Sequence, residues 1–192
     1  MKTTRIALCA ALAAALGGIA AAHTGATGIV LERMKAMSAM AEGVKEMTPM
    51  MRGAAPYDAS AVSAFAIMVE GHAGEAMTSL FPEDADRTAS KTRPETWEAF
   101  DEFSELADRL EVQARGLALA AANASGEGGG MMTSGMTGGM TDGMTGGMVG
   151  GMDAAPAKMD VEALGAMPAD AVFAMIGQTC STCHTRFRAK DG

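Results

Sequence analysis

Residues 94–122 carry apolar side chains at intervals of three and four, with charged or small residues at most positions between them. This spacing gives a helix with one apolar stripe, and the stripe has to be buried against other elements. The same helical spacing recurs in three other segments, 28–47, 60–80 and 168–188. Four such helices predict an all-α fold, an antiparallel four-helix bundle.

The composition agrees with a helical fold. Hydrophobic residues make up 48% of the 192 residues but aromatic residues only 4%, and the good helix formers Ala, Met, Leu and Glu are abundant. A β-sandwich or barrel is therefore disfavoured. The formal net charge is -8, and no basic stripe is present to neutralise phosphates, so nucleic acid is not an expected partner.

The first 22 residues have the pattern of a secretory signal peptide. Lys2 and Arg5 precede an apolar run, and the small residues at 20–22 suit cleavage after Ala22. The alternative is a membrane anchor, but the run is shorter than the roughly 20 residues that cross a bilayer. We expect one exported domain, residues 23–192, in the periplasm and without a stable membrane span.

Caps and prolines set the expected limits of the helices. Thr48–Pro49 predicts a kink or a short restart in the first helix, and either Asp58 or Ser60 caps the second. Pro94 and Pro168 suit the first turns of the last two helices. The expected buried face of the second helix holds Val62, Phe65, Met68, His72, Ala76 and Leu80. That of the third holds Trp97, Phe100, Phe103, Leu106 or Ala107, Leu110, Ala114 and Leu117.

A Cys-x-x-Cys-His sequence at residues 180–184 is the pattern of covalent c-type haem attachment. On a helix, residues three and four apart share a face, so Cys180, Cys183 and His184 project toward one object. Two thiols at this spacing can form thioethers with the haem vinyl groups, while the imidazole ligates the iron. The motif therefore predicts one covalently bound haem c near the C-terminus.

Other interpretations of the haem motif fit less well. A structural zinc site needs four ligands, and the sequence has no second Cys pair. A thioredoxin-like site needs an adjacent βαβ unit, which this helical pattern lacks. A disulfide between Cys180 and Cys183 is awkward within a helix and leaves His184 unexplained.

Only eight residues follow His184, so a second axial ligand has to come from earlier in the chain. In this respect the chain resembles the class II c-type cytochromes, the cytochrome c′ family, over residues 28–122 and 158–190. The resemblance rests on the haem motif, on Phe187-Arg188 behind it, and on Val-Leu-Glu-Arg at 30–33 followed by Met37. It implies the same four-helix bundle.

The resemblance also implies roles for residues of the first helix. Met37 stands where low-spin members of the family carry an axial thioether ligand, whereas five-coordinate members carry an apolar residue there. Arg33 would approach a haem propionate, and Phe187 would pack against the porphyrin. Met34 as the ligand, or no Met ligand, remain alternatives, because Met34, Met37 and Met40 also have the spacing of an ordinary core stripe.

Residues 126–157 depart from the family pattern. Within them Met recurs at every fourth position from 132 to 152, separated by Gly and Thr. Gly at this density disfavours helix, so we expect a flexible insert between the third and fourth helices. A passive linker is the simpler interpretation, and thioether capture of Cu(I) is the alternative.

These features predict a periplasmic electron-transfer haem protein with a His184/Met37 six-coordinate iron and no enzymatic activity. The expected partners are redox proteins and the cytochrome c maturation machinery, and relatives often form homodimers. The alternative is a five-coordinate, cytochrome c′-like protein that binds NO or a similar small gas. His72 is a weaker candidate for a second ligand, and the acidic side of the third helix is a weaker candidate for a docking surface.

Overall fold

The computed structural model describes residues 26–83, 89–124 and 160–190. The expected signal peptide and the Met-rich insert lie outside these residues. Four long helices form the body of the molecule, α1 (Gly28–Met51), α2 (Ala59–Glu70), α5 (Phe100–Ala120) and α7 (Ala169–Phe187). Three short helices join them, α3 (Gly74–Thr78), α4 (Glu95–Glu98) and α6 (Val161–Gly165).

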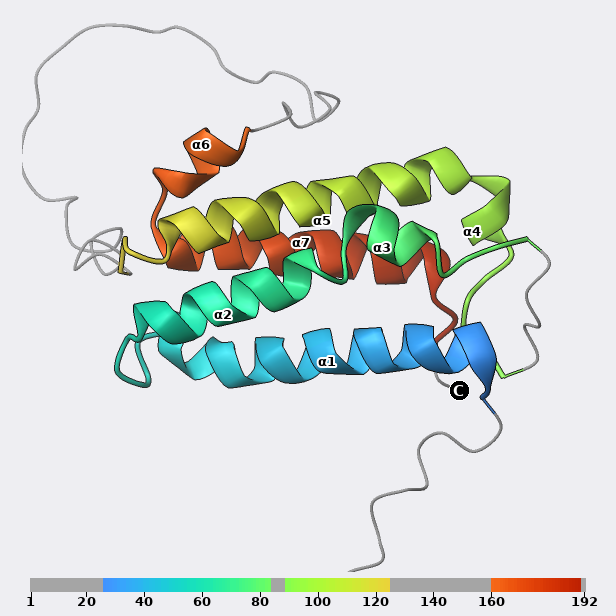
Figure 1. Ribbon diagram of the computed structural model, residues 1–192, viewed down its shortest axis with the longest axis horizontal. Coiled ribbons are helices and arrows are strands. Elements are labelled where there is room, and N and C mark those ends of the chain that lie inside the picture. The colour runs from blue at the N-terminus through green and yellow to red at the C-terminus, as the bar shows by residue number, and fades with distance from the viewer. Residues whose placement is uncertain (1–25, 84–88, 125–159, 191–192) are drawn as a thin grey trace, which may run out of the picture.

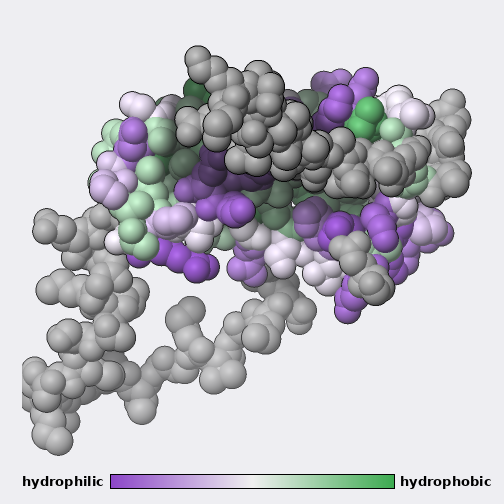
Figure 2. All heavy atoms as spheres, turned by 90° about the horizontal axis from the view of Figure 1, so that it is seen from below, coloured by the Kyte–Doolittle hydropathy of each residue, from purple (hydrophilic) through white to green (hydrophobic). Residues whose placement is uncertain are grey.

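The long helices pack as a bundle (Figure 1). Helix α5 lies beside α7 and α2, while α1 lies along the other side of α2 and α7. One continuous core joins them, and its largest fully buried side chains include Phe103, Leu117, Ile176 and Val62. On the α1 side, hydrophilic and hydrophobic residues intermingle on the visible face (Figure 2). The expected four-helix bundle is thus confirmed.

Helix α1 runs to Met51 with Pro49 inside it, so the short restart expected at Thr48–Pro49 is wrong. The proline lies in the last turn, where its missing N–H removes a single hydrogen bond from the helix. In addition, the Thr48 hydroxyl donates to the Val44 carbonyl at 2.6 Å, one turn earlier. These two conditions let the helix tolerate Pro49.

The expected second helix is instead two helices, α2 and α3. The chain turns at 71–73, and Gly74 has φ +54°, which the absence of a side chain permits. The Glu111 side chain of α5 occupies the space that a Cβ on Gly74 would need, so α3 packs closely on α5. The expected buried stripe therefore ends at this turn, and Ala76 is exposed while Ala73 and Met77 are buried.

The expected third helix is also interrupted. Ala99 has φ -126° and ψ 49°, which separates α4 from α5. This break turns Phe100 outward, and it is 37% exposed rather than buried as expected. The remaining caps follow the sequence: Asp58 accepts from the backbone of α2, and Pro168 immediately precedes α7.

Candidate haem site

The haem motif lies in the last two turns of α7. Cys183 and His184 border two cavities between α1 and α7, and Cys180 borders one of them. Met37 of α1 borders both cavities from the opposite wall. The three residues common to both cavities therefore occupy the middle of one elongated cleft.

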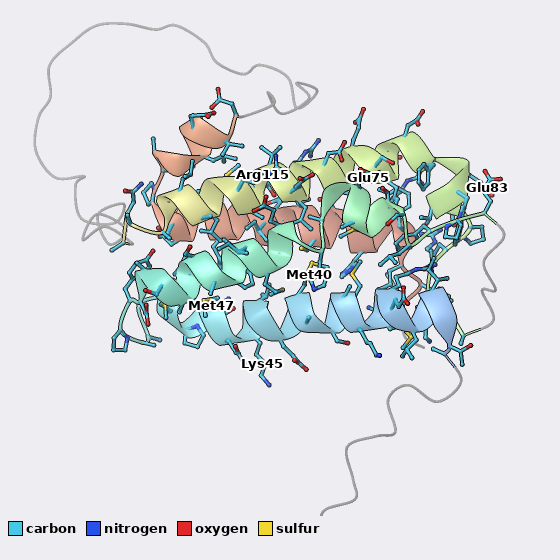
Figure 3. All side chains as sticks on the ribbon, in the orientation of Figure 1. Met40, Lys45, Met47, Glu75, Glu83 and Arg115 are labelled. Carbon is cyan, nitrogen blue, oxygen red and sulfur yellow. The ribbon has the colours of Figure 1, made fainter. Side chains whose placement is uncertain are left out.

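The two halves of the cleft have different chemistry. One half, here called the apolar cavity, has a volume of about 240 Å³, and Cys180 lines one of its walls. Its other walls are mainly aliphatic side chains from α1, α3 and α5, including Met40, Val44, Met77, Leu106 and Leu110. Figure 3 shows Met40 pointing from α1 toward the interior, whereas Lys45 points away from it.

The other half, here called the polar cavity, also has a volume of about 240 Å³. It lies between α1, the end of α7 and the segment that precedes α5. Besides His184, its polar side chains are Arg33, Ser38, Ser90, Lys91, Thr92, Thr96 and Arg188. Three of these are cationic, and no carboxylate borders either cavity within the described part of the chain.

A haem fits this division of the cleft. The ring is largely apolar, its two vinyl groups receive the Cys thiols, and its two propionates are acidic. The apolar cavity contains Cys180, while the polar cavity offers cations and hydroxyls to carboxylates. The fully buried Thr96 hydroxyl has no hydrogen-bond partner among the described residues. An unpaired buried hydroxyl is expected where a bound polar group supplies the missing partner.

The two thiols are protonated in this surrounding. Burial raises the pKa of Cys180, and burial together with the neighbouring Cys180 raises the pKa of Cys183 to about 11. Both cysteines are free, so no disulfide joins them. Neutral thiols are poor ligands for a metal ion, which needs thiolates.

His184 is exposed at the surface, yet the protein still partly desolvates its ring. This desolvation lowers the pKa of His184, and the nearby Arg188 charge lowers it further. A neutral imidazole, with a nitrogen lone pair free, is the form that ligates iron. The described residues contain no cluster of three or more His, Cys, Asp or Glu side chains that would hold a metal ion instead.

Three methionines of α1 border different parts of the cleft. Met34 borders only the polar cavity, Met40 only the apolar cavity, and Met37 both. Met37 is half-buried and packs against the core. Of the three, only Met37 therefore lines both cavities together with Cys183 and His184.

Arg33 is buried, with only 5% of its surface exposed. Its guanidinium donates to the Leu80 carbonyl at 2.7 and 3.1 Å and to Ser90 and Thr92 at 3.2 and 3.0 Å. It also lies over the Phe81 ring, 3.9 Å from its centroid. Arg33 thus holds the segment before α5 against α1, in addition to presenting its charge to the polar cavity.

Phe187 borders the polar cavity and is buried, with its ring edge-on to Phe103 at 5.5 Å. Behind it the backbone of Arg93 donates to the Phe187 carbonyl at 2.9 Å, and Ala189 donates to Lys91 at 2.8 Å. These bonds bring residues 90–93 to the cavity. The sequence analysis missed them, because residues 82–93 showed only a polar, irregular pattern. His72 borders neither cavity.

The fold and the site thus define a helical-bundle haem protein. A model of the family described as cytochrome C′ matches residues 28–136, more than half of the chain. This match does not include the haem motif, so the two indications are independent. The chain therefore belongs to the cytochrome c′ family and binds one covalently attached haem c.

Solved structures show the same fold. Cytochrome c′ from Thermochromatium tepidum is 20% identical, with a TM-score of 0.55, over 84% of this chain and 95% of that one. A nitric oxide complex of a cytochrome c prime variant from Alcaligenes xylosoxidans is 21% identical, with a TM-score of 0.54, over 85% and 94%. No curated protein matches this chain.

No helix among the described residues has the length and apolar character needed to cross a membrane.

Proposed function

We propose that this protein binds a small diatomic gas such as NO at its haem iron. Family membership supports a haem protein, and the solved neighbours include several nitric oxide complexes of cytochrome c prime. These neighbours favour gas binding over the electron transfer that the sequence analysis placed first. The observation that carries the proposal in this chain is the aliphatic wall around Met37, opposite the haem motif, because an apolar wall beyond a bound ring suits a small uncharged ligand.

The residues have distinct roles in this proposal. Cys180 and Cys183 anchor the ring, His184 ligates the iron from α7, and the side chains of the apolar cavity exclude water from it. When bound, the haem supplies an iron that can take one further ligand on the side of Met37. Met37 then controls that position, either as a replaceable ligand or as a steric cover.

Electron transfer is the second candidate, and Met37 favours it. A thioether opposite an imidazole gives a six-coordinate iron with a raised potential, as in electron-carrying cytochromes. Met37 borders both halves of the cleft, opposite the haem motif. In this reading the haem held by Cys180, Cys183 and His184 would supply one-electron chemistry, and no substrate would be transformed.

We also propose that the protein is exported to the periplasm, where the maturation machinery attaches the haem. The N-terminal pattern at 1–22 supports export, and covalent attachment of haem c outside the cytoplasm fits it. Redox proteins remain the proposed partners of an electron carrier, and a homodimer is the proposed assembly.

An optical spectrum of the matured protein distinguishes the two functions. Gas binding predicts a spectrum that shifts when NO or CO is added, from a high-spin form if Met37 is a steric cover and from a low-spin form if Met37 is a replaceable ligand. Electron transfer predicts a low-spin spectrum with the weak thioether-to-iron band and little response to CO. A protein without any haem absorption, made in a host with the maturation machinery, would contradict both.

A further inference from the structure

The hydroxyls of the polar cavity form a chain whose hydrogens can be assigned. Ser90 Oγ accepts from Arg33 at 3.2 Å and from the Thr92 backbone N–H at 3.1 Å. A hydroxyl oxygen has two acceptor sites, so both are used. The Ser90 hydrogen therefore donates to Thr92 Oγ1, which lies 2.9 Å away.

The same count leaves Thr92 with a hydrogen to give. Thr92 Oγ1 accepts from Ser90 and, at 3.0 Å, from Arg33, which uses both of its acceptor sites. No described residue accepts the Thr92 hydroxyl hydrogen at hydrogen-bond distance. Since Thr92 borders the polar cavity, this hydrogen is available to a group inside the cavity.

Thr96 is a second donor without an acceptor. It is 0% exposed, it borders the same cavity, and its Oγ1 has no hydrogen-bond partner among the described residues. Buried polar side chains are seldom left unpaired in native proteins, because the lost hydrogen bonds to water are not replaced. Two of the hydroxyls that border this cavity, those of Thr92 and Thr96, thus lack an acceptor among the described residues.

The charge of the cavity shows what kind of acceptor fits. The charged side chains that border it are Arg33, Lys91 and Arg188, and no described carboxylate borders it. An anionic acceptor is therefore favoured over a neutral one. Cys180 borders only the apolar cavity and Cys183 borders both, so the thioether edge of a bound haem would lie toward the apolar cavity and its acidic edge toward the polar cavity.

We propose that Thr92 and Thr96 donate hydrogen bonds to a haem propionate, with Arg33 holding Thr92 in place. This inference rests on the proposed placement of the haem in the cleft and deepens it. It assigns a positioning role to two residues before α5 that the sequence analysis did not single out.

The test uses the matured holoprotein and resonance Raman spectroscopy of the propionate bending mode, which responds to hydrogen bonding. Thr92→Val and Thr96→Val each keep the side-chain shape but remove the hydroxyl, and each should shift the band. Thr96→Ser keeps the hydroxyl and should leave the band unshifted. Thr48→Val is the matched control, because its hydroxyl donates within α1 and does not border the cavity.

An unshifted band in both valine variants, with a raised melting temperature for Thr96→Val, would overturn the inference. That result would mean that neither hydroxyl donates to a propionate. It would also mean that the unpaired Thr96 hydroxyl only lowers the stability of the protein. Haem absorption of the same samples separates the two levels of the proposal: a pigmented protein with an unshifted band contradicts the propionate contact alone. An unpigmented protein contradicts the haem placement as well.

Discussion

The two cavities share Met37, Cys183 and His184 but are built in different ways. The apolar cavity is made by regular helices, and its side chains repeat at helical spacing along α1 and α5. The polar cavity depends on residues 90–93, which pack by individual hydrogen bonds to Arg33 and to the end of α7. The helices therefore supply a dry wall for the ring, while the irregular segment supplies charge and donors for its acidic edge.

The largest effect is expected where the two cavities meet. Replacing both thiols, Cys180→Ser with Cys183→Ser, removes both thioether bonds, so no haem should remain attached after denaturation. Mass spectrometry of the denatured protein measures this loss, and Ser181→Ala is the matched control because Ser181 lies between the cysteines and is exposed. Haem still attached to the double variant would show that the motif is not the anchor.

Met37 also borders both cavities, and Met37→Leu tests whether its thioether binds the iron. If the Met37 thioether occupies the sixth position, the leucine variant should become high-spin, and its apparent affinity for CO should rise about tenfold or more, because the competing ligand is gone. A CO titration followed optically measures the change. Met34→Leu is the control, since Met34 borders only the polar cavity. An unchanged spectrum and affinity would remove Met37 from the iron.

The apolar cavity should respond to loss of volume. Leu106 is 6% exposed and borders this cavity, so Leu106→Ala should lower the free energy of unfolding of the holoprotein by about 3 kcal/mol. Denaturant unfolding followed by circular dichroism measures it. Leu119→Ala is the matched control, because Leu119 is 55% exposed. Equal effects of the two changes would contradict this assignment of the core.

The polar cavity should respond to loss of hydrogen bonds. Arg33→Met keeps much of the aliphatic stem but leaves the Leu80 carbonyl and two hydroxyls without their donor, so the free energy of unfolding should fall by about 2 kcal/mol. Arg33→Lys should recover part of this loss, since one ammonium reaches fewer acceptors. The same unfolding measurement tests both. If Arg33→Met is as stable as the wild type, Arg33 does not hold Leu80, Ser90 and Thr92 in place.

Much of the bundle was predictable from the sequence, and the reasons are specific. Phe103, Leu106, Leu110 and Leu117 fall on one helical stripe, and all four are buried. The breaks at Gly74 and Ala99 were not predicted. The break at Gly74 depends on its positive φ and on close packing against α5, and the break at Ala99 depends on its backbone angles. The helical spacing of apolar residues continues across a short break in a helix, so this spacing does not reveal the break.

The candidate site likewise has residues that the sequence predicts and residues that it does not. The haem motif is local in the sequence, so its spacing alone brings three side chains to one face. Thr92 and Thr96 have no such pattern, and they reach the cavity through long-range bonds such as Arg33 to Thr92. Only the folded chain places them there.

The smallest effect is expected far from both cavities. Tyr57 donates to the Ala121 carbonyl at 2.8 Å, so Tyr57→Phe should lower the free energy of unfolding by about 1 kcal/mol without changing the haem spectrum. Burial raises the pKa of Tyr57 above 10.0, and the Asp170 charge adds to this.

The raised pKa sets the sign of a pH effect. The contribution of Tyr57 to stability is present below its unfolded pKa and is lost as the pH rises through the higher folded pKa. The phenylalanine variant should therefore lose less stability than the wild type above about pH 10. Unfolding curves at neutral and alkaline pH measure the difference, and parallel losses in both proteins would contradict it.

A crystal structure of the matured holoprotein tests the placement of the haem most directly. The account predicts thioethers to Cys180 and Cys183, the His184 ring on the iron, Met37 over the opposite face, and a propionate beside Thr92 and Thr96. A ring turned so that its propionates enter the space lined by Met77 and Leu110, or bound elsewhere on the surface, would contradict it.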